Sequence, residues 1–212
     1  MIKIVIADDH QLVREGIKRI LAEEEEFEIV AEASNGEQVI DMVREHNPDV
    51  VLMDITMPGF DGMETTRRLI KNRTKTLRVV ILTMHADEHY AARLMRMGAT
   101  GYVVKDAAPS ELAEAIRTAH QGRRYVSTPL RDSLALRFIE GLEDEPIDTL
   151  TDREFQVLSR LAMGATNREI ADELSVSVKT IDAHRLNLLA KLRLRNNSEL
   201  TKFAMQNGII QV

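Results

Sequence analysis

Short apolar runs alternate with amphipathic stretches along the first 121 residues, and this alternation constrains the fold more than any other feature. The apolar runs indicate strands at Ile2–Ala7, Glu28–Ala33, Val50–Met53, Val79–Thr83 and Gly101–Val104. Apolar residues recur at helical spacing in Leu12–Ala22, Glu37–Arg44, Met63–Ile70, Glu88–Met97 and Glu111–His120. Five strand–helix pairs in this order predict an α/β domain, a (βα)5 doubly wound parallel sheet with helices on both faces.

The rest of the chain has a different pattern. Residues 122–147 read as a linker, with one helix over Leu130–Ile139 and an acidic, turn-rich part at 141–146. From 148 to 212 the pattern is all helical, with four helices that end near Met163, Leu174, Leu192 and Asn207. Ser175–Ser177 forms a short turn before the helix Val178–Leu192, so this domain is predicted to contain a helix-turn-helix.

Composition sets the broad class. The formal net charge is −6, and residues 1–147 hold 19 of the 28 Lys/Arg and 26 of the 34 Asp/Glu, which makes the first part acidic and the second nearly neutral. Cysteine is absent, so disulfides and cysteine-based zinc sites are excluded. The N-terminus does not resemble a signal peptide, and no apolar run approaches the roughly 18 residues of a membrane span. We expect a cytoplasmic protein that does not contact a membrane.

Polar residues stand at the ends of four predicted strands. Asp8 and Asp9 follow the first strand, Asp54 the third, Thr83 ends the fourth and Lys105 follows the fifth. Because the carboxyl ends of parallel strands meet at one edge, these side chains are expected to lie together. Three carboxylates there would repel one another unless a divalent cation joined them, and oxygen ligands suit Mg²⁺. A carboxylate is also a possible nucleophile toward phosphorus.

Each of these residues also has an ordinary structural interpretation. Asp8 and Asp9 could cap a helix, Asp54 could belong to the turn before Pro58, and Lys105 could be a surface lysine. Four such coincidences at four strand ends are much less probable than one site. We therefore interpret the group as a phosphoryl and Mg²⁺ site.

Residues 1 to about 121 resemble a two-component receiver domain. The resemblance rests on Ala7-Asp8-Asp9, Met53 to Gly62, Leu82-Thr83 and Gly101 to Lys105. It implies that Asp54 accepts a phosphoryl group from a sensor histidine kinase, and that Thr83 and Lys105 contact that group. It also implies that Mg²⁺ is held by Asp8, Asp9, Asp54 and the carbonyl of Ile55, and that Tyr102 occupies the switch-aromatic position.

Residues 148–212 resemble the LuxR-type DNA-binding domain. The matching segments are Leu150 to Glu154, Gly164 to Ala171 and Ser177 to Arg185. Both domains together resemble the response regulators of the NarL/FixJ family. That resemblance implies a transcription regulator, not an enzyme with a separate substrate, in which phosphorylation promotes dimers and sequence-specific DNA binding.

The helix Val178–Leu192 can be examined as a recognition helix. Helical periodicity places four apolar residues on the face expected to pack inward: Val178, Ile181, Leu188 and Leu192. The candidate DNA-contacting residues are Lys179, Thr180, Ala183, His184, Arg185, Asn187 and Lys191. Arg185 lies on the inward-facing side of this helix, so it either reaches a phosphate or forms a structural ion pair.

Two other functional classes remain open at this point. Haloacid-dehalogenase-type phosphatases also use an aspartate after an apolar strand, but they need a second aspartate two positions later, where this chain has Thr56. Alternatively, the helical domain could dock on a protein and not on DNA. DNA footprinting would separate this last alternative from a transcription regulator.

Overall fold

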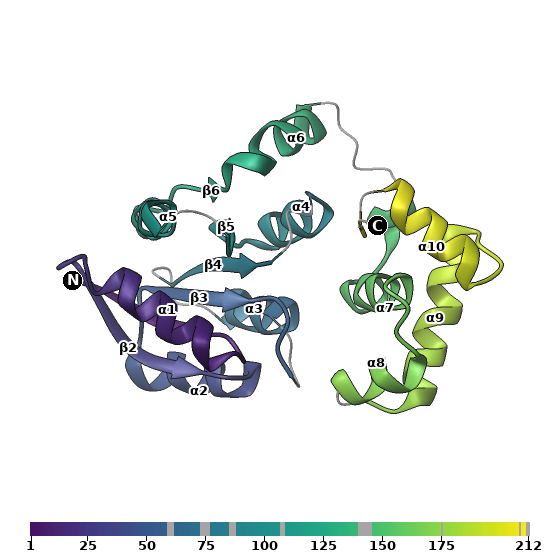
Figure 1. The fold of residues 1–212 in the computed structure, drawn as a ribbon, viewed down its shortest axis with the longest axis horizontal. Coiled ribbons are helices and arrows are strands. Elements are labelled where there is room, and N and C mark those ends of the chain that lie inside the picture. Colours follow the sequence, from purple (N-terminus) through teal and green to yellow (C-terminus); the bar gives the residue numbers. More distant parts are fainter. Residues whose placement is uncertain are drawn as a thin grey trace. The chain divides into compact units, whose positions relative to one another are not determined.

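The fold was analysed in a computed structural model that describes residues 1–58, 62–72, 77–84, 88–106, 109–139, 146–174, 176–207 and 209–210. The chain divides into two compact units, Met1–Leu134 and Ala135–Val212 (Figure 1). Four features expected from the sequence lie outside the described residues: the turn at Gly59, the acidic part of the linker at 141–145, Ser175, and Gly208, the expected end of the last helix.

The first unit is built on a six-stranded, wholly parallel sheet with the strand order β2-β1-β3-β4-β5-β6. The strands are β1 (Ile2–Ala7), β2 (Phe27–Ala33), β3 (Val50–Asp54), β4 (Arg78–Thr83), β5 (Gly101–Val104) and β6 (Tyr125–Val126). All five residues of β3 are buried, as expected for a strand covered on both faces. The predicted doubly wound parallel sheet is confirmed, although it has one more strand than the sequence indicated.

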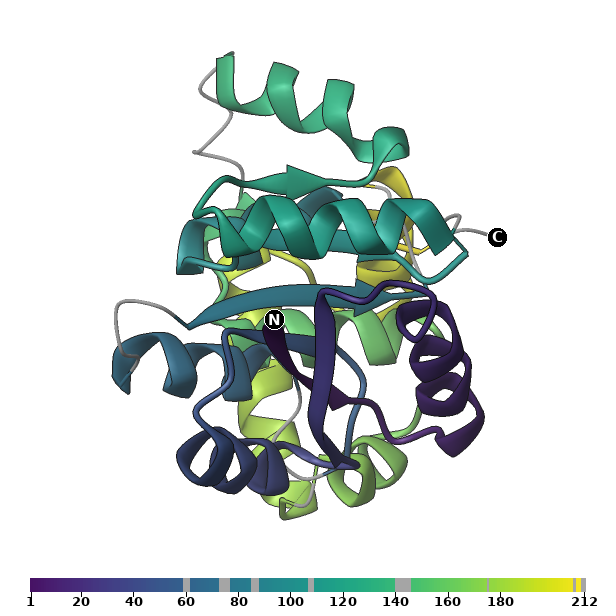
Figure 2. The same ribbon diagram turned by 90° about the vertical axis from the view of Figure 1, so that its left-hand side faces the viewer.

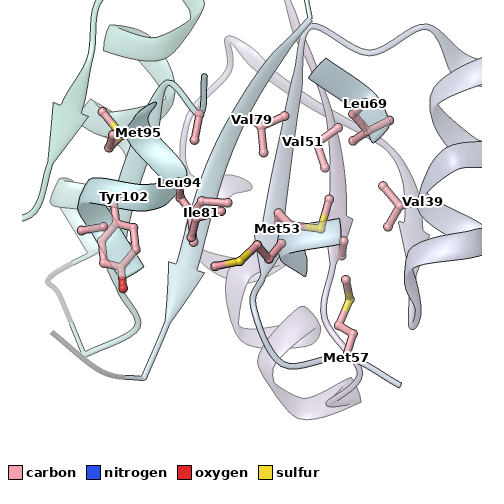
Figure 3. Close-up of a cluster of buried hydrophobic side chains, with 14 of the residues drawn as sticks. Val39, Val51, Met53, Met57, Leu69, Val79, Ile81, Leu94, Met95 and Tyr102 are labelled. Atoms are coloured by element: carbon pink, nitrogen blue, oxygen red, sulfur yellow. The ribbon is translucent and has the colours of Figure 1, made fainter. Parts of the chain in front are cut away.

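Helices cover both faces of this sheet, and each face forms its own core. The helices are α1 (Gln11–Leu21), α2 (Gly36–His46), α3 (Gly62–Asn72), α4 (Glu88–Met97) and α5 (Pro109–His120). Side chains alternate along each strand, so that Val50 and Leu52 pack with α1 and α5 while Val51 and Met53 pack with α2, α3 and α4. Figure 3 shows the core that contains Val51 and Met53.

The chain leaves the first unit through β6 and α6 (Thr128–Ile139), which can be followed in Figure 2 from α5 onward. Leu130 and Leu134 of α6 are buried in the same core as α4. The sequence predicted the helix but started it at Leu130, and it missed β6. A two-residue strand is too short to show a period, so no pattern in the sequence could reveal it.

The second unit is helical. It contains a 3-10 turn (Pro146–Thr149), α7 (Asp152–Ala162), α8 (Asn167–Glu173), α9 (Val178–Leu192) and α10 (Asn197–Gln206). Thr151 with Glu154 and Thr166 with Glu169 form complete capping boxes, which confirms the starts expected for α7 and α8. Ser177 caps α9 by accepting a hydrogen bond from the backbone N–H of Thr180. None of the helices described is long and apolar enough to cross a membrane.

Two glycines of the first unit differ in the space around them, and they give a matched test of the packing. A methyl group on Gly62 would overlap the backbone oxygen of Asp54, whereas a methyl on Gly16 would meet nothing within 4 Å. We predict that Gly62→Ala lowers the free energy of unfolding by about 1–3 kcal/mol, because the backbone at Asp54 must move. Gly16→Ala in α1 is expected to raise it by about 0.5–1 kcal/mol.

Urea denaturation of both variants and of the unchanged protein measures these differences. A Gly62→Ala protein as stable as the unchanged one would show that the backbone at Asp54 is not closely packed.

Candidate functional site

The strand ends bring the predicted acidic residues to one edge of the sheet. Asp54 is the last residue of β3, Asp8 follows β1, and Lys105 follows β5. Asp8 and Asp54 are buried, with exposed fractions of 0% and 4%. The site therefore combines two carboxylates that are fixed inside the molecule with the exposed carboxylate of Asp9.

The ammonium of Lys105 lies between the two buried carboxylates. Its Nζ is 2.6 Å from Oδ2 of Asp8 and 3.0 Å from Oδ2 of Asp54. These residues are separated by 97 and 51 positions in the chain, and only the parallel sheet brings them together. The backbone supports the arrangement, because the N–H of Lys105 donates to the carbonyl of Thr83 at 2.6 Å.

The electrostatics of Asp54 favour a cation beside this carboxylate. Burial raises the pKa of Asp54 above its ordinary value of 3.8, and the negative charge of Asp8 adds to this increase. The ammonium of Lys105 and the N–H of Thr56 act in the opposite direction. Two carboxylates share one ammonium, so the ionised site carries excess negative charge that a divalent cation would neutralise.

The residues that could hold such a cation include one that the sequence analysis missed. Asp8, Asp9, His10 and Asp54 each offer a ligand atom, and these atoms all lie within 4.8 Å of one another. Nδ1 of His10 is 2.7 Å from Oδ1 of Asp9. In the sequence, only the position of His10 directly after Asp8 and Asp9 pointed to it as a ligand. The three carboxylates suit Mg²⁺, while an imidazole ligand would favour a transition metal.

The carbonyl of Ile55 does not fit the role that the family resemblance implied. The peptide between Ile55 and Thr56 is trans, so its N–H and C=O point in opposite directions. Because the N–H of Thr56 binds Asp54, the Ile55 carbonyl is directed away from that carboxylate, and it accepts from Gly62 N at 2.9 Å. The geometry therefore disfavours Ile55 as a ligand.

Arg14 is a second residue that the sequence analysis overlooked. Its Nη1 donates to the backbone carbonyl of Asp8 at 2.8 Å, and its Nε donates to Glu32 at 3.0 Å. Oδ1 of Asp8 in turn accepts from the backbone N–H of His10 at 2.8 Å. These hydrogen bonds fix the turn between β1 and α1, and with it the orientation of the buried carboxylate.

Thr83 and Tyr102, the predicted switch pair, lie on the neighbouring strands β4 and β5. Both are buried, and Tyr102 has no exposed surface. Figure 3 shows the Tyr102 ring in the core near Ile81, Leu94 and Met95. The switch aromatic is therefore in contact with the core that also contains the buried residues of α6.

The helix α9 presents most of the predicted DNA-contacting residues to solvent. Lys179, Ala183 and Asn187 are exposed, while Thr180, His184 and Arg185 are partly buried. Ile181, Leu188 and Leu192 are buried as expected. Val178 was expected to pack inward but is 42% exposed, because it is the first residue of the helix and lies beyond the packed part of the face.

The ammonium of Lys191 is engaged within its own unit. Its Nζ lies 2.6 Å from Oε2 of Glu154 and donates to the carbonyl of Thr149 at 3.1 Å. Glu154 is buried, which would raise its pKa, but hydrogen bonds from Lys191 and Thr151 outweigh burial and lower the pKa. Lys191 thus joins α9 to the start of α7, which gives it a structural role.

Other polar residues of α9 also have partners. Nε of Arg185 donates to Asn197 at 2.8 Å, so this arginine ties α9 to α10. Asp182 accepts from Nδ2 of Asn167 at 2.5 Å, which holds α8 and α9 together. Burial and the nearby Arg153 lower the pKa of His184, which favours its neutral form.

Comparison with known proteins gives the same two domains. Residues 4–117 match the response regulator receiver domain, and residues 148–204 match the family described as bacterial regulatory proteins, luxR family. The chain is a response regulator of the NarL/FixJ family. It thus belongs to a family of response regulators and not of enzymes that turn over a separate substrate, which sets the phosphatase alternative aside.

Relatives of this response regulator match it over nearly its whole length. Response regulator UvrY of Escherichia coli (strain K12) is 38% identical over 210 residues, which cover 99% of this chain and 96% of UvrY. Response regulator GacA of Pseudomonas aeruginosa is 38% identical over 211 residues, covering 99% of this chain and 98% of GacA. Members of this family bind DNA and act with sensor kinases.

Solved structures support the architecture of the regulator. Salmonella typhimurium RcsB, studied for conformational dynamism in DNA interaction, aligns with a TM-score of 0.74 at 25% identity, covering 97% of this chain and 98% of RcsB. RcsB of Salmonella enterica serovar Typhimurium, bound to the promoter rprA with the phosphomimetic BeF3−, gives 0.69 at 25% identity, covering 95% of this chain and 97% of RcsB.

Proposed function

We propose that this regulator accepts a phosphoryl group on Asp54 from a sensor histidine kinase, and that this reaction controls DNA binding through α9. The observation that carries the proposal is the ammonium of Lys105 placed between the buried carboxylates of Asp8 and Asp54. The ammonium is well placed to meet a negatively charged group delivered to Asp54.

The transfer itself requires little from the protein beyond position and charge. A carboxylate oxygen of Asp54 attacks the phosphorus of a phosphohistidine, the new P–O bond forms, and the P–N bond breaks with its electron pair on the imidazole. Lys105 then turns from the carboxylates to an oxygen of the phosphoryl group, and the hydroxyl of Thr83 donates to another. Such charge stabilisation is the main catalytic contribution in phosphoryl transfer.

Receiver domains generally bind Mg²⁺ at an acidic pocket, and the residues of this chain fit that ion. Asp8, Asp9 and Asp54 would hold it, since carboxylate oxygens are ligands that Mg²⁺ prefers. When bound, Mg²⁺ supplies positive charge to the phosphoryl oxygens. Our proposal leaves out the Ile55 carbonyl, which points away from the carboxylate of Asp54.

Phosphorylation would change the regulator through Thr83 and Tyr102. A phosphoryl group beside Thr83 alters the end of β4, and Tyr102 is buried on the adjacent strand. Such a change acts as a shift between two states of the receiver, which the modification favours to different extents. The expected result is a homodimer, because two copies of α9 read two half-sites where one reads few base pairs.

On the DNA side we propose that Lys179, Thr180, Ala183 and Asn187 make the principal contacts. Lys179 follows the first residue of α9, and the N-terminal part of a recognition helix is the part that reaches the major groove. His184 and Arg185 are partly buried and stand at the border of this surface. Lys191 remains a predicted contact only if DNA draws its ammonium away from Glu154.

Replacing Asp54 tests the phosphorylation site. We predict that Asp54→Asn abolishes labelling by acetyl phosphate in the presence of Mg²⁺, because an amide cannot act as the nucleophile. Asp41→Asn is the control, since Asp41 is an exposed acid on α2. Phosphate-affinity gel electrophoresis measures both. Acid-stable labelling that persists in Asp54→Asn would place the reaction on another residue.

Replacing Lys179 and Lys191, which both lie on α9, tests DNA binding and stability separately. We predict that Lys179→Ala weakens DNA binding without changing the melting temperature. The slope of log K against log salt concentration should become shallower by about 0.9 for each phosphate that the variant no longer neutralises. Lys191→Ala is expected to lower stability by about 1–3 kcal/mol, because it removes the partner of the buried Glu154.

DNA fragments recovered by immunoprecipitation of the unchanged protein serve as the probe, and fluorescence anisotropy at several salt concentrations gives the slope. If Lys179→Ala binds with unchanged affinity and slope, Lys179 does not touch the DNA. If no fragment is enriched at all, the second unit is a protein-docking domain.

A further inference from the structure

The parallel pairing of β5 and β6 ends in an unusual way at Ser127. The pairing begins regularly, with the N–H of Tyr125 donating to the carbonyl of Thr100 at 3.0 Å. Two residues later the N–H of Ser127 donates to the carbonyl of Tyr102 at 2.9 Å. In a parallel ladder of this register, the next bond would run from the N–H of Val104 to the main-chain carbonyl of Ser127.

The side chain of Ser127 replaces that carbonyl. The N–H of Val104 donates to Oγ of Ser127 at 3.1 Å, in a buried position. The carbonyl of Ser127 instead accepts from the N–H of Leu130 at 2.9 Å, which forms the first turn of α6. A serine before a helix commonly caps the N–H groups of that helix, whereas here its hydroxyl is used on β5.

Ser127 links β5 to α6, and the β5 end of this link lies next to the proposed phosphorylation site. Val104 directly precedes Lys105, whose ammonium joins Asp8 and Asp54. Ser127 is completely buried, so its hydroxyl meets the N–H of Val104 away from bulk solvent. The end of β5 that carries Lys105 is therefore held on one side by Thr83 of β4 and on the other by Ser127.

The other end is the start of α6. Leu130 and Leu134 are buried in the core that contains Tyr102. Nε of Arg131 donates to the carbonyl of Val126 at 2.8 Å, and its guanidinium lies 5.1 Å from the centre of the Tyr125 ring. The first turns of α6 are thus fixed to β6, which pairs with β5, the strand that leads to Lys105. α6 is also the segment that continues toward the DNA-binding domain.

We propose that Ser127 is a positioning residue that couples the phosphorylation site to the linker helix α6. Its hydroxyl sets the end of β5 and hence Lys105, and its carbonyl sets the first turn of α6. A movement of β5 on phosphorylation of Asp54 is passed to α6 through the hydrogen bonds of this residue. The inference rests on the proposed phosphorylation of Asp54.

Amide hydrogen exchange of the full-length protein tests this coupling without a known DNA site. Exchange at Val104 and in the first turns of α6 is measured by NMR before and after phosphorylation with acetyl phosphate and Mg²⁺. The variants are Ser127→Ala and Ser127→Cys, the second of which keeps an atom at the position of the hydroxyl oxygen but is a weak acceptor. Ser159→Ala is the control, because Ser159 is an equally buried serine in α7.

In the unchanged protein and in Ser159→Ala, phosphorylation is expected to change exchange both at Val104 and in α6. Both Ser127 variants should exchange about tenfold faster at Val104 before phosphorylation, the factor for removal of a hydrogen bond of ordinary strength. They should still be labelled on Asp54 and still respond at Val104, but the response of α6 should disappear.

A response of α6 that is as large in both Ser127 variants as in the unchanged protein would overturn the coupling role. So would an α6 that does not respond in the fully labelled protein of unchanged sequence, and that result would leave phosphorylation of Asp54 intact. Failure of the unchanged protein to be labelled would instead contradict the proposed function, and the coupling with it.

Discussion

The ammonium of Lys105 between Asp8 and Asp54 is the interaction on which the receiver unit depends. It joins the ends of β1, β3 and β5, which come from three distant parts of the chain. Burial and the charge of Asp8 raise the pKa of Asp54, and the ammonium of Lys105 acts against that rise. The excess of negative charge at this site suits a divalent cation, and the charge of that cation would in turn attract a phosphoryl group.

The topology supplies what this interaction needs. Parallel strands place all their carboxyl ends at one edge, and the order β1-β3-β4-β5 sets Thr83 of β4 between Asp54 and Lys105. Buried apolar side chains on both faces of β3 hold Asp54 rigidly, and the hydrogen bonds of Arg14 hold the turn at Asp8. The parts of the fold far from the site therefore serve mainly to fix a few polar atoms within a few ångströms.

Much of this arrangement could be predicted from the sequence, for reasons that individual residues make clear. Long periodic segments such as Val178–Leu192 matched the structure, and Asp8, Asp54 and Lys105 were expected together because parallel strand ends converge. The misses have physical causes. β6 is too short for periodicity, and Val178 lies at a helix end where helical periodicity no longer predicts burial. The partner of Lys191 is 37 residues away and is revealed only by the tertiary structure, while its role as a DNA contact stays a prediction. The direction of the Ile55 carbonyl depends on one peptide plane, which no pattern of side chains records.

The central claim is that the carboxylates at this edge form a divalent cation site beside Asp54. Anomalous diffraction from crystals soaked in Mn²⁺, which stands in for Mg²⁺ among oxygen ligands, tests it most directly. The account predicts an anomalous peak within bonding distance of carboxylate oxygens of Asp8, Asp9 and Asp54. A peak bound elsewhere on the molecule, with none at these three residues, would contradict it.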